Sequence, residues 1–133
     1  MNFIRKIKLK LFDHSEEKTI IGECEVHEDN LILSLQNTYQ VINLRDLAYC
    51  MSDKGYTTFY LYSGKSFLAS NPLKYFETQL PEYIFFRTHQ SYYVNINFVD
   101  KYDKRGFLIL TNGKKIPVST RKRDAFIARL LNL

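Results

Sequence analysis

Two polar stretches of this chain carry the side chains best suited to chemistry. In the first, residues 85–97, a burst of hydrogen-bonding side chains interrupts an apolar run. The second is the basic cluster at residues 119–123. Polar groups packed so densely beside core-forming residues need partners inside or outside the protein. The basic cluster favours an outside partner that carries phosphate.

The first stretch combines one side chain suited to reading a base with others suited to phosphate. Gln90 offers a donor and an acceptor together, which matches an adenine edge in the major groove. Arg87 and Thr88 can reach phosphate oxygens. Short polar side chains beside a core usually cap turns, so we expect three others to satisfy one another and the backbone: His89, Ser91 and Asn95.

The second stretch places three adjacent cations where a helix is predicted to begin. Arg121, Lys122 and Arg123 oppose the helix dipole, which prefers negative charge at that end. A bound phosphate would relieve this conflict. A solvated basic turn is the alternative interpretation. Lys114, close to the predicted turn before this cluster, can extend the same patch.

The sequence carries no local signature of an enzyme, a metal site or a cofactor. The three His and the two Cys are scattered, and there is no Gly-rich phosphate loop and no nucleophile elbow. A Cys–His pair formed in space stays open as an alternative. We therefore expect a protein that is not an enzyme and needs no cofactor.

The composition is that of a single globular domain rich in strands. The 133 residues are 45% apolar and 25% charged, and they include ten Tyr and ten Phe. Such a chain is long enough for one core, and aromatic residues favour β-structure. It contains no apolar run of about 18 residues that could span a membrane. Two isolated Cys suit a reducing compartment, so we expect a cytoplasmic protein.

Positive charge is concentrated in the last quarter of the chain. The formal net charge is +5, and residues 99–133 carry nine basic and three acidic side chains. Residues 1–29 carry five basic and seven acidic side chains. A surface built from the last segment would suit a polyanion, although a basic face without a ligand explains the charge equally well.

Hydrophobic periodicity predicts many strands and two helices. Alternating or short apolar runs indicate strands at residues 3–12, 20–26, 31–35, 40–44, 48–51, 56–62 and 66–69. Asn71 is a suitable cap for a helix with Pro72 at its first position, and Pro81 ends it. Three apolar residues of this helix share one face: Leu73, Phe76 and Leu80.

The last third of the chain predicts a hairpin followed by a terminal helix. Asn112 and Gly113 suit the two positive-φ positions of a type I′ turn between strands at residues 107–111 and 114–118. Ser119 is a plausible cap for a helix whose apolar residues recur at helical spacing: Phe126, Ile127, Leu130 and Leu131. The whole is a mainly β domain.

In this order the motifs resemble the LytTR family of bacterial DNA-binding domains. Residues 85–95, Phe-Phe-Arg-Thr-His-Gln-Ser-Tyr-Tyr-Val-Asn, are similar to the family's pattern, and residues 110–119 are similar to its closing hairpin and serine. The resemblance covers residues 30–133 and leaves residues 1–29 as an N-terminal extension, either an extra strand or an arm. It implies an elongated, mainly β fold of stacked antiparallel sheets, with one short internal helix and a short C-terminal helix.

The resemblance also implies a function and a set of DNA contacts. Loops of such domains enter successive major grooves of double-stranded promoter DNA, and the base-contacting positions fall here on Tyr56, Gln90 and Arg121. The phosphate contacts that we expect beside them are Lys54, Arg87, Thr88, Lys114, Lys122 and Arg123. Family members occupy paired direct repeats, which implies a second copy on the same DNA. They typically serve as output domains of response regulators, although the signalling partner of this chain is unidentified.

The leading hypothesis is a sequence-specific transcriptional regulator that binds double-stranded DNA. Two alternatives remain at this stage. Exposed tyrosines could instead stack the bases of single-stranded nucleic acid. Residues 1–29 could add an acidic arm or edge strand that recruits a protein.

Overall fold

Alternation of apolar and polar residues produces antiparallel strands through most of the chain. The computed structural model describes residues 5–13, 16–34 and 37–132. In chain order the strands are β1 (Arg5–Asp13), β2 (Glu16–His27), β3 (Asn30–Ser34), β4 (Tyr39–Asn43), β5 (Leu47–Asp53), β6 (Tyr56–Leu61), β7 (Ser66–Ala69), β8 (Phe85–His89), β9 (Tyr92–Asn95), β10 (Val99–Asp103), β11 (Phe107–Leu110) and β12 (Lys115–Pro117). The helices are α1 (Leu73–Gln79) and α2 (Arg123–Leu131), and a short 3₁₀ turn, Thr120–Lys122, precedes α2.

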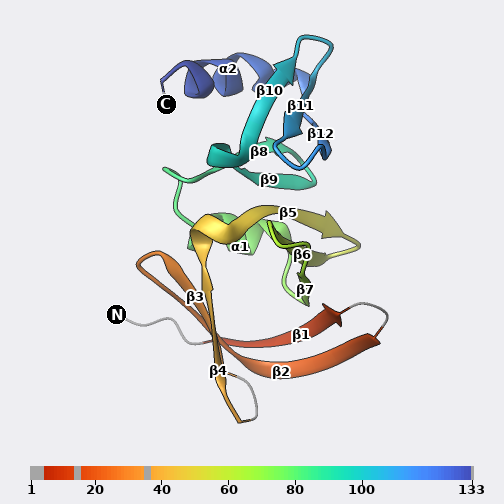
Figure 1. The fold of residues 1–133 in the computed structure, drawn as a ribbon, viewed down its shortest axis with the longest axis vertical. Coiled ribbons are helices and arrows are strands. Elements are labelled where there is room, and N and C mark those ends of the chain that lie inside the picture. The colour runs from red at the N-terminus through yellow and green to blue at the C-terminus, as the bar shows by residue number, and fades with distance from the viewer. Residues whose placement is uncertain (1–4, 14–15, 35–36, 133) are drawn as a thin grey trace.

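The strands stack along the long axis of the molecule, as the resemblance implied (Figure 1). Within the described residues, one nine-stranded antiparallel sheet has the order β4-β3-β2-β1-β7-β6-β5-β9-β8, and a three-stranded sheet has the order β10-β11-β12. β1–β4 lie at one end of the long axis, β10–β12 and α2 lie at the other, and α1 lies between them. The predicted mainly β fold with two short helices is confirmed.

The described part of the N-terminal segment is built into the larger sheet. β1 pairs with β2 over its whole length, and its second half pairs with β7 from Leu9↔Ala69 to Phe12↔Ser66. β2 in turn pairs with β3, which pairs with β4. Residue 29 therefore lies in the turn between two paired strands, and a domain boundary at this position stays a prediction.

Two hydrophobic cores lie on opposite faces of the central strands, because successive residues of a strand point to opposite sides. Cys50 and Tyr93 belong to a core that α1 covers, where the Phe59 and Phe76 rings meet edge to face at 4.8 Å. The neighbouring residues of the same strands, Tyr49 and Val94, belong to the second core. That core joins the central strands to the three-stranded sheet and α2.

The predicted internal helix is present, but Asn71 does not cap it. Its apolar face is confirmed by three residues that are at most 3% exposed: Leu73, Phe76 and Leu80. The helix is instead capped at Pro72, without a side-chain hydrogen bond, and Asn71 uses its carbonyl to accept the Thr57 hydroxyl at 2.8 Å. No helix in the described part of the chain combines the length and the apolar character that a membrane crossing requires.

Two further local predictions need correction. Gly113 has a positive φ but Asn112 does not, so the β11–β12 turn is not type I′; Asn112 Oδ1 instead accepts the Lys114 amide at 3.0 Å. The pair with two positive φ values is Lys54 (50°) and Gly55 (85°), between β5 and β6. Ser119 makes no side-chain cap, and α2 begins only at Arg123 after the 3₁₀ turn.

Candidate nucleic-acid interface

The β8–β9 turn presents Gln90 to solvent from two strands that are fixed in the core. Phe85 of β8 and Tyr93 of β9 are 2% exposed, and their rings stack with centroids 5.2 Å apart. Burial raises the pKa of Tyr93, whose hydroxyl donates to the Leu80 carbonyl at 3.3 Å. Gln90 is exposed, and its side chain forms no hydrogen bond with any described residue. The amide is therefore available to a ligand.

Arg87 holds this turn from within, which corrects the predicted phosphate contact. Its Nε donates to the His89 carbonyl at 3.0 Å, and its Nη2 donates to the Gln90 carbonyl. Its Nη1 donates to Glu77 Oε1 at 2.8 Å, and only 18% of the side chain is exposed. These donors are committed inside the protein, so Arg87 shapes the turn instead of reaching outward.

Thr88 also faces inward, and the predicted phosphate contact for it is wrong. The residue is 0% exposed, and its Oγ1 has no hydrogen-bond partner among the described residues. The expected internal hydrogen bonds are confirmed for the side chains of His89 and Asn95, whereas Ser91 takes part through its backbone. His89 Nδ1 accepts the Ser91 amide at 3.0 Å, and Asn95 Nδ2 donates to the Leu47 carbonyl at 3.0 Å.

A single backbone hydrogen bond joins the basic segment to β8. The Ser119 amide donates to the Thr88 carbonyl at 2.8 Å, two residues before Arg121 on one side and two residues before Gln90 on the other. Arg121 is exposed and Lys122 is half-buried, and neither side chain has a polar partner among the described residues. The structure thus brings together two stretches that are separated in the sequence.

A second backbone hydrogen bond adds the β5–β6 turn to the same edge. The Ser52 amide donates to the Ser91 carbonyl at 2.8 Å, beside the turn that carries Lys54. Lys54 is exposed and Tyr56 is 49% exposed. We call this arrangement the three-turn edge, and it consists of residues 54–56, 90–91 and 120–122.

Two other predicted phosphate contacts do not belong to the three-turn edge. Arg123 Nε donates to the Val118 carbonyl at 3.3 Å, and its guanidinium lies over Gly106, where a Cβ would collide with it. Lys114 Nζ lies 5.9 Å from the centre of the Tyr49 ring. The pKa of Tyr49 is raised to about 12, mainly by burial and to a smaller extent by the nearby Tyr60 and Tyr92.

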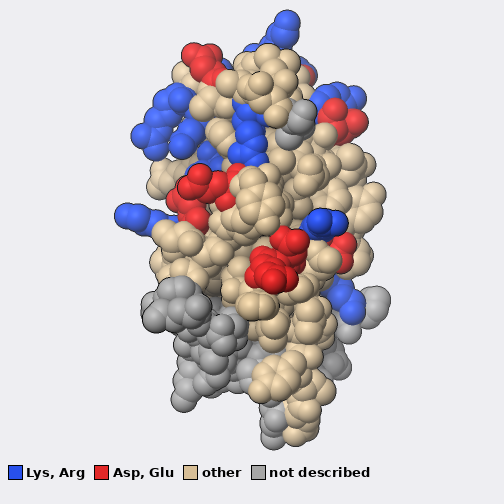
Figure 2. Space-filling view, turned by 90° about the vertical axis from the view of Figure 1, so that its left-hand side faces the viewer, with Lys and Arg blue, Asp and Glu red and all other residues tan. Residues whose placement is uncertain are grey.

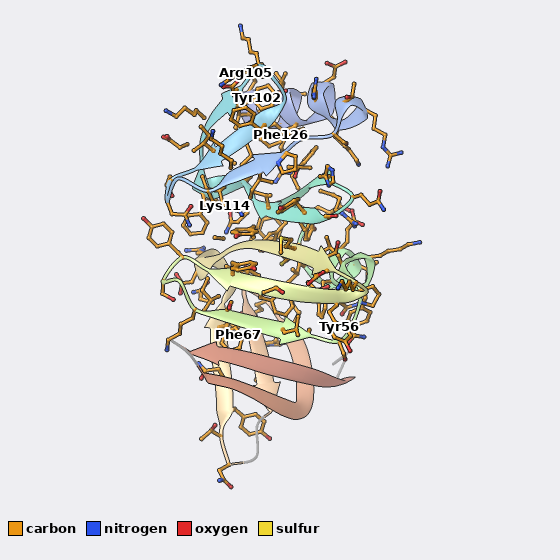
Figure 3. All side chains as sticks on the ribbon, turned by 90° about the vertical axis from the view of Figure 1, so that its right-hand side faces the viewer. Tyr56, Phe67, Tyr102, Arg105, Lys114 and Phe126 are labelled. Carbon is orange, nitrogen blue, oxygen red and sulfur yellow. The ribbon has the colours of Figure 1, made fainter. Side chains whose placement is uncertain are left out.

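Figure 3 shows Lys114 and Tyr56 at opposite sides of the molecule in that view, so Lys114 lies away from the β5–β6 turn of the three-turn edge. Lys114 lies in the β11–β12 turn, and its side chain reaches the Tyr49 ring of the second core. The edge therefore keeps Lys54 and Lys122 as its candidate phosphate ligands, beside Arg121.

Basic side chains predominate in the half of the molecule built from β8–β12 and α2. Figure 2 shows Lys and Arg gathered over the upper part of one face, with Asp and Glu both among them and below them. Some of these cations are already neutralised. Arg105 Nη2 lies 2.7 Å from Asp103 Oδ2, and hydrogen bonds from Arg105 lower the pKa of Asp103 to about 2. Arg121 and Lys122 have no such partner in the described part of the chain.

A model of the LytTr DNA-binding domain matches residues 37–131, which is more than half of the chain. The chain belongs to the LytTr DNA-binding domain family. The Bacillus subtilis protein described as sensory transduction protein LytT is 27% identical over 96 residues, which cover 69% of this chain and 39% of that protein. This chain thus spans about two fifths of the length of that relative.

A solved LytTr DNA-binding domain from Bacillus cereus has the same fold. It is 23% identical, with a TM-score of 0.64, and the match covers 78% of this chain and 98% of the solved one. The family match begins at residue 37, so β1, β2 and β3 lie outside it.

Two residues that position side chains near the three-turn edge were not predicted from the sequence: Glu77 and Gly106. Glu77 lies on α1 and anchors Arg87, while Gly106 leaves room for the guanidinium of Arg123. Both residues lie outside the two motifs, which span residues 85–95 and 110–119. The one available signal is that a helix carrying a carboxylate precedes a strand carrying an arginine, which is too general to predict a contact. Among the described residues, no group of three His, Cys, Asp or Glu side chains is arranged to hold a metal.

Proposed function

We propose that this LytTr domain is a sequence-specific transcriptional regulator that reads the major grooves of double-stranded DNA with the three-turn edge. The observation that carries the proposal is the pair of backbone hydrogen bonds, Ser119 to Thr88 and Ser52 to Ser91, because they line up turns from three distant segments. Successive turns along one edge suit successive contacts along a duplex. The surplus of cations near the edge suits phosphate.

Five side chains of the edge have distinct proposed roles. Gln90 pairs with the N6 and N7 atoms of an adenine, and Arg121 pairs with the O6 and N7 atoms of a guanine. Tyr56 contacts a base through its half-exposed ring. Lys54 and Lys122 hold the register by contacting phosphates.

The proposal extends to how the protein acts on a promoter. Two copies bind paired direct repeats, and the chain supplies the output of a signalling pathway. The description of the Bacillus subtilis relative as a sensory transduction protein is compatible with such a role. Reading by turns rather than by a recognition helix is supported by the position of α2, whose Phe126 is 0% exposed and packs in the second core.

Selection of a random double-stranded library at two salt concentrations tests the proposal. The wild type should enrich a defined sequence, and raising the salt should weaken binding. Arg121→Ala and Gln90→Ala should each lose about 1–3 kcal/mol of discrimination at one base pair. Arg121→Ala should also reduce the slope of log affinity against log salt, by about one if Arg121 neutralises a phosphate.

Matched controls lie elsewhere on the surface. Arg45→Ala removes the same charge from an exposed position near Tyr83, and Gln40→Ala removes an exposed amide from β4. Neither control should change the selected sequence. Enrichment of unpaired strands, or equal effects of the edge variants and their controls, would count against the proposal.

A further inference from the structure

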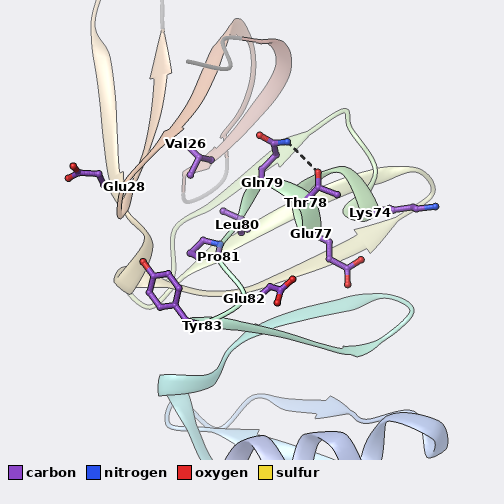
Figure 4. Close-up of a pocket in the computed structure, with 10 residues that line it drawn as sticks. All are labelled: Val26, Glu28, Lys74, Glu77, Thr78, Gln79, Leu80, Pro81, Glu82 and Tyr83. Atoms are coloured by element: carbon purple, nitrogen blue, oxygen red, sulfur yellow. Dashed lines mark hydrogen bonds between the residues drawn. The ribbon is translucent and has the colours of Figure 1, made fainter. Parts of the chain in front are cut away.

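The direction of Gln90 depends on a helix that carries none of the predicted DNA contacts. The guanidinium of Arg87, a residue of β8, donates hydrogen bonds to two backbone carbonyls at the β8–β9 turn, those of His89 and Gln90. The third contact of the same guanidinium is Glu77 of α1, at 2.8 Å. Figure 4 shows Glu77 pointing away from α1 toward the hairpin that carries this turn.

These three contacts together fix the position of the Arg87 guanidinium. A guanidinium is planar, so satisfying three acceptors at once fixes its orientation as well as its position. Arg87 is the less exposed partner of the pair, at 18% against 39% for Glu77. An ion pair that is partly shielded from water keeps more of its strength than one on an open surface.

Without Glu77, the Arg87 side chain would keep its hydrogen bonds to the two turn carbonyls but would lose the contact that anchors it to α1. Such an arginine would have its own charge uncompensated and could rotate toward solvent or toward phosphate. The carbonyl of Gln90 would then lose its donor, and the turn would sample other orientations. The amide of Gln90, which has no side-chain partner of its own among the described residues, would follow the backbone.

We propose that Glu77 and Arg87 form a positioning pair that sets the base preference at the position read by Gln90. This inference rests on the proposed function, and it assigns α1 a part in sequence reading. Neither member of the pair touches DNA. Their effect on recognition is carried by the backbone of residues 89–90.

The cleft beside α1 offers a matched control for Glu77. A surface cleft of about 610 Å³ is lined by residues of the β2–β3 turn, α1 and the segment after α1, including Glu77, Glu82 and Tyr83 (Figure 4). Glu82 is exposed and makes no hydrogen bond or ion pair with Arg87. Glu82→Gln therefore removes the same charge from the same cleft without touching the turn.

The DNA test is a double-mutant cycle between Glu77→Gln and Gln90→Ala. Glu77→Gln should reduce discrimination at the Gln90 base pair by about threefold to tenfold, the size expected for one charge-assisted contact. In the Gln90→Ala background, Glu77→Gln should cause no further loss at that base pair. Glu82→Gln should match the wild type. An equal loss in both backgrounds, or no loss at all, would overturn the positioning role.

A second measurement tests the pair without DNA. Amide hydrogen exchange of Ser91, whose N–H bonds His89 Nδ1 within the turn, should rise about threefold to tenfold in Glu77→Gln and stay unchanged in Glu82→Gln. Exchange of Tyr93 should stay slow in both variants, because its strand is buried. Unchanged Ser91 exchange would overturn the inference even if the wild type selects a DNA sequence. Changed exchange in a protein without sequence preference would instead count against the proposed function alone.

Discussion

The stretch around the β8–β9 turn and the basic segment at residues 119–123 are both polar in sequence, but the structure uses their side chains differently. Arg87 and Thr88 of β8 face inward, whereas Gln90 in the turn that follows faces solvent. In the basic segment the first cation, Arg121, is exposed, while the last, Arg123, is tied to the backbone. Hydrogen bonds from Arg87 fix the backbone that carries Gln90, whereas the Arg121 side chain has no polar partner among the described residues.

This difference suggests a division of labour along the three-turn edge. A side-chain amide on a fixed backbone discriminates between bases because its donor and acceptor must meet a matching pattern. A free cation contributes attraction that depends on salt and little on sequence unless it reaches a base. Three sets of variants test this comparison, in decreasing order of expected effect. They change the core that both regions share, the β5–β6 turn and the buried hydroxyl of Thr88.

The largest effect is expected from removing the core that both regions share. Phe126 is 0% exposed, and its ring meets Phe86 of β8 at 5.5 Å and Tyr102 of β10 at 5.6 Å. Phe126→Ala should lower the free energy of unfolding by about 3–5 kcal/mol, because it leaves a large cavity. Urea denaturation measures this loss.

Ile127→Ala is the matched control, because Ile127 is 36% exposed on the same helix. It should change stability by less than about 1 kcal/mol. If the two variants were equally mild, α2 would not support the basic segment as described.

A smaller effect is expected at Lys54, whose positive φ is costly for a residue with a Cβ. Lys54→Asn should raise the free energy of unfolding by about 0.5–1 kcal/mol, because Asn tolerates this conformation better. The same variant should weaken DNA binding and reduce its salt dependence. Together these results would show a lysine kept for contact at a cost in stability.

The control is Lys65→Asn, in the turn at the other end of β6, where the lysine has no positive φ. It should leave both stability and DNA affinity nearly unchanged. Equal weakening of binding by the two variants would indicate a general effect of charge and no special role for the β5–β6 turn.

The smallest effect is expected at Thr88, whose buried hydroxyl has no partner among the described residues. Thr88→Val keeps the shape and removes the unsatisfied group, so it should be neutral or stabilise the fold by up to about 1 kcal/mol. DNA affinity should not change, in contrast to a phosphate contact. A loss above about 1 kcal/mol in urea denaturation would mean that the hydroxyl has a partner such as a bound water.

Periodicity predicted the local elements well because it is set by residues that are neighbours in sequence. The short aromatic-rich run at residues 56–62 predicted β6, and the spacing of Leu73, Phe76 and Leu80 predicted the buried face of α1. Turn geometry was less predictable. Asn112 and Gly113 suit the two adjacent positive φ values of a type I′ turn, but Lys54 and Gly55 are the neighbours that adopt them.

The direction of polar side chains could not be predicted, because it depends on partners far along the chain. Arg87 turns inward because α1 brings Glu77 to it, and Arg123 turns inward because Gly106 leaves space above the β10–β11 turn. The position of β1 between β2 and β7 likewise depends on pairing with a strand more than 50 residues away. Gln90 and Arg121 could be selected from the sequence because Gln90 lies inside a recognisable motif and Arg121 lies just after one, and their contacts with DNA stay predictions.

The most direct test of the account is to map a selected DNA duplex onto the protein by NMR. Amide chemical-shift changes should concentrate in the three-turn edge, at residues 54–56, 90–91 and 120–122. Residues 62–65, at the opposite end of β6, should not change. Changes centred on residues 62–65 or on the exposed side of α2, with the three turns unaffected, would contradict the account.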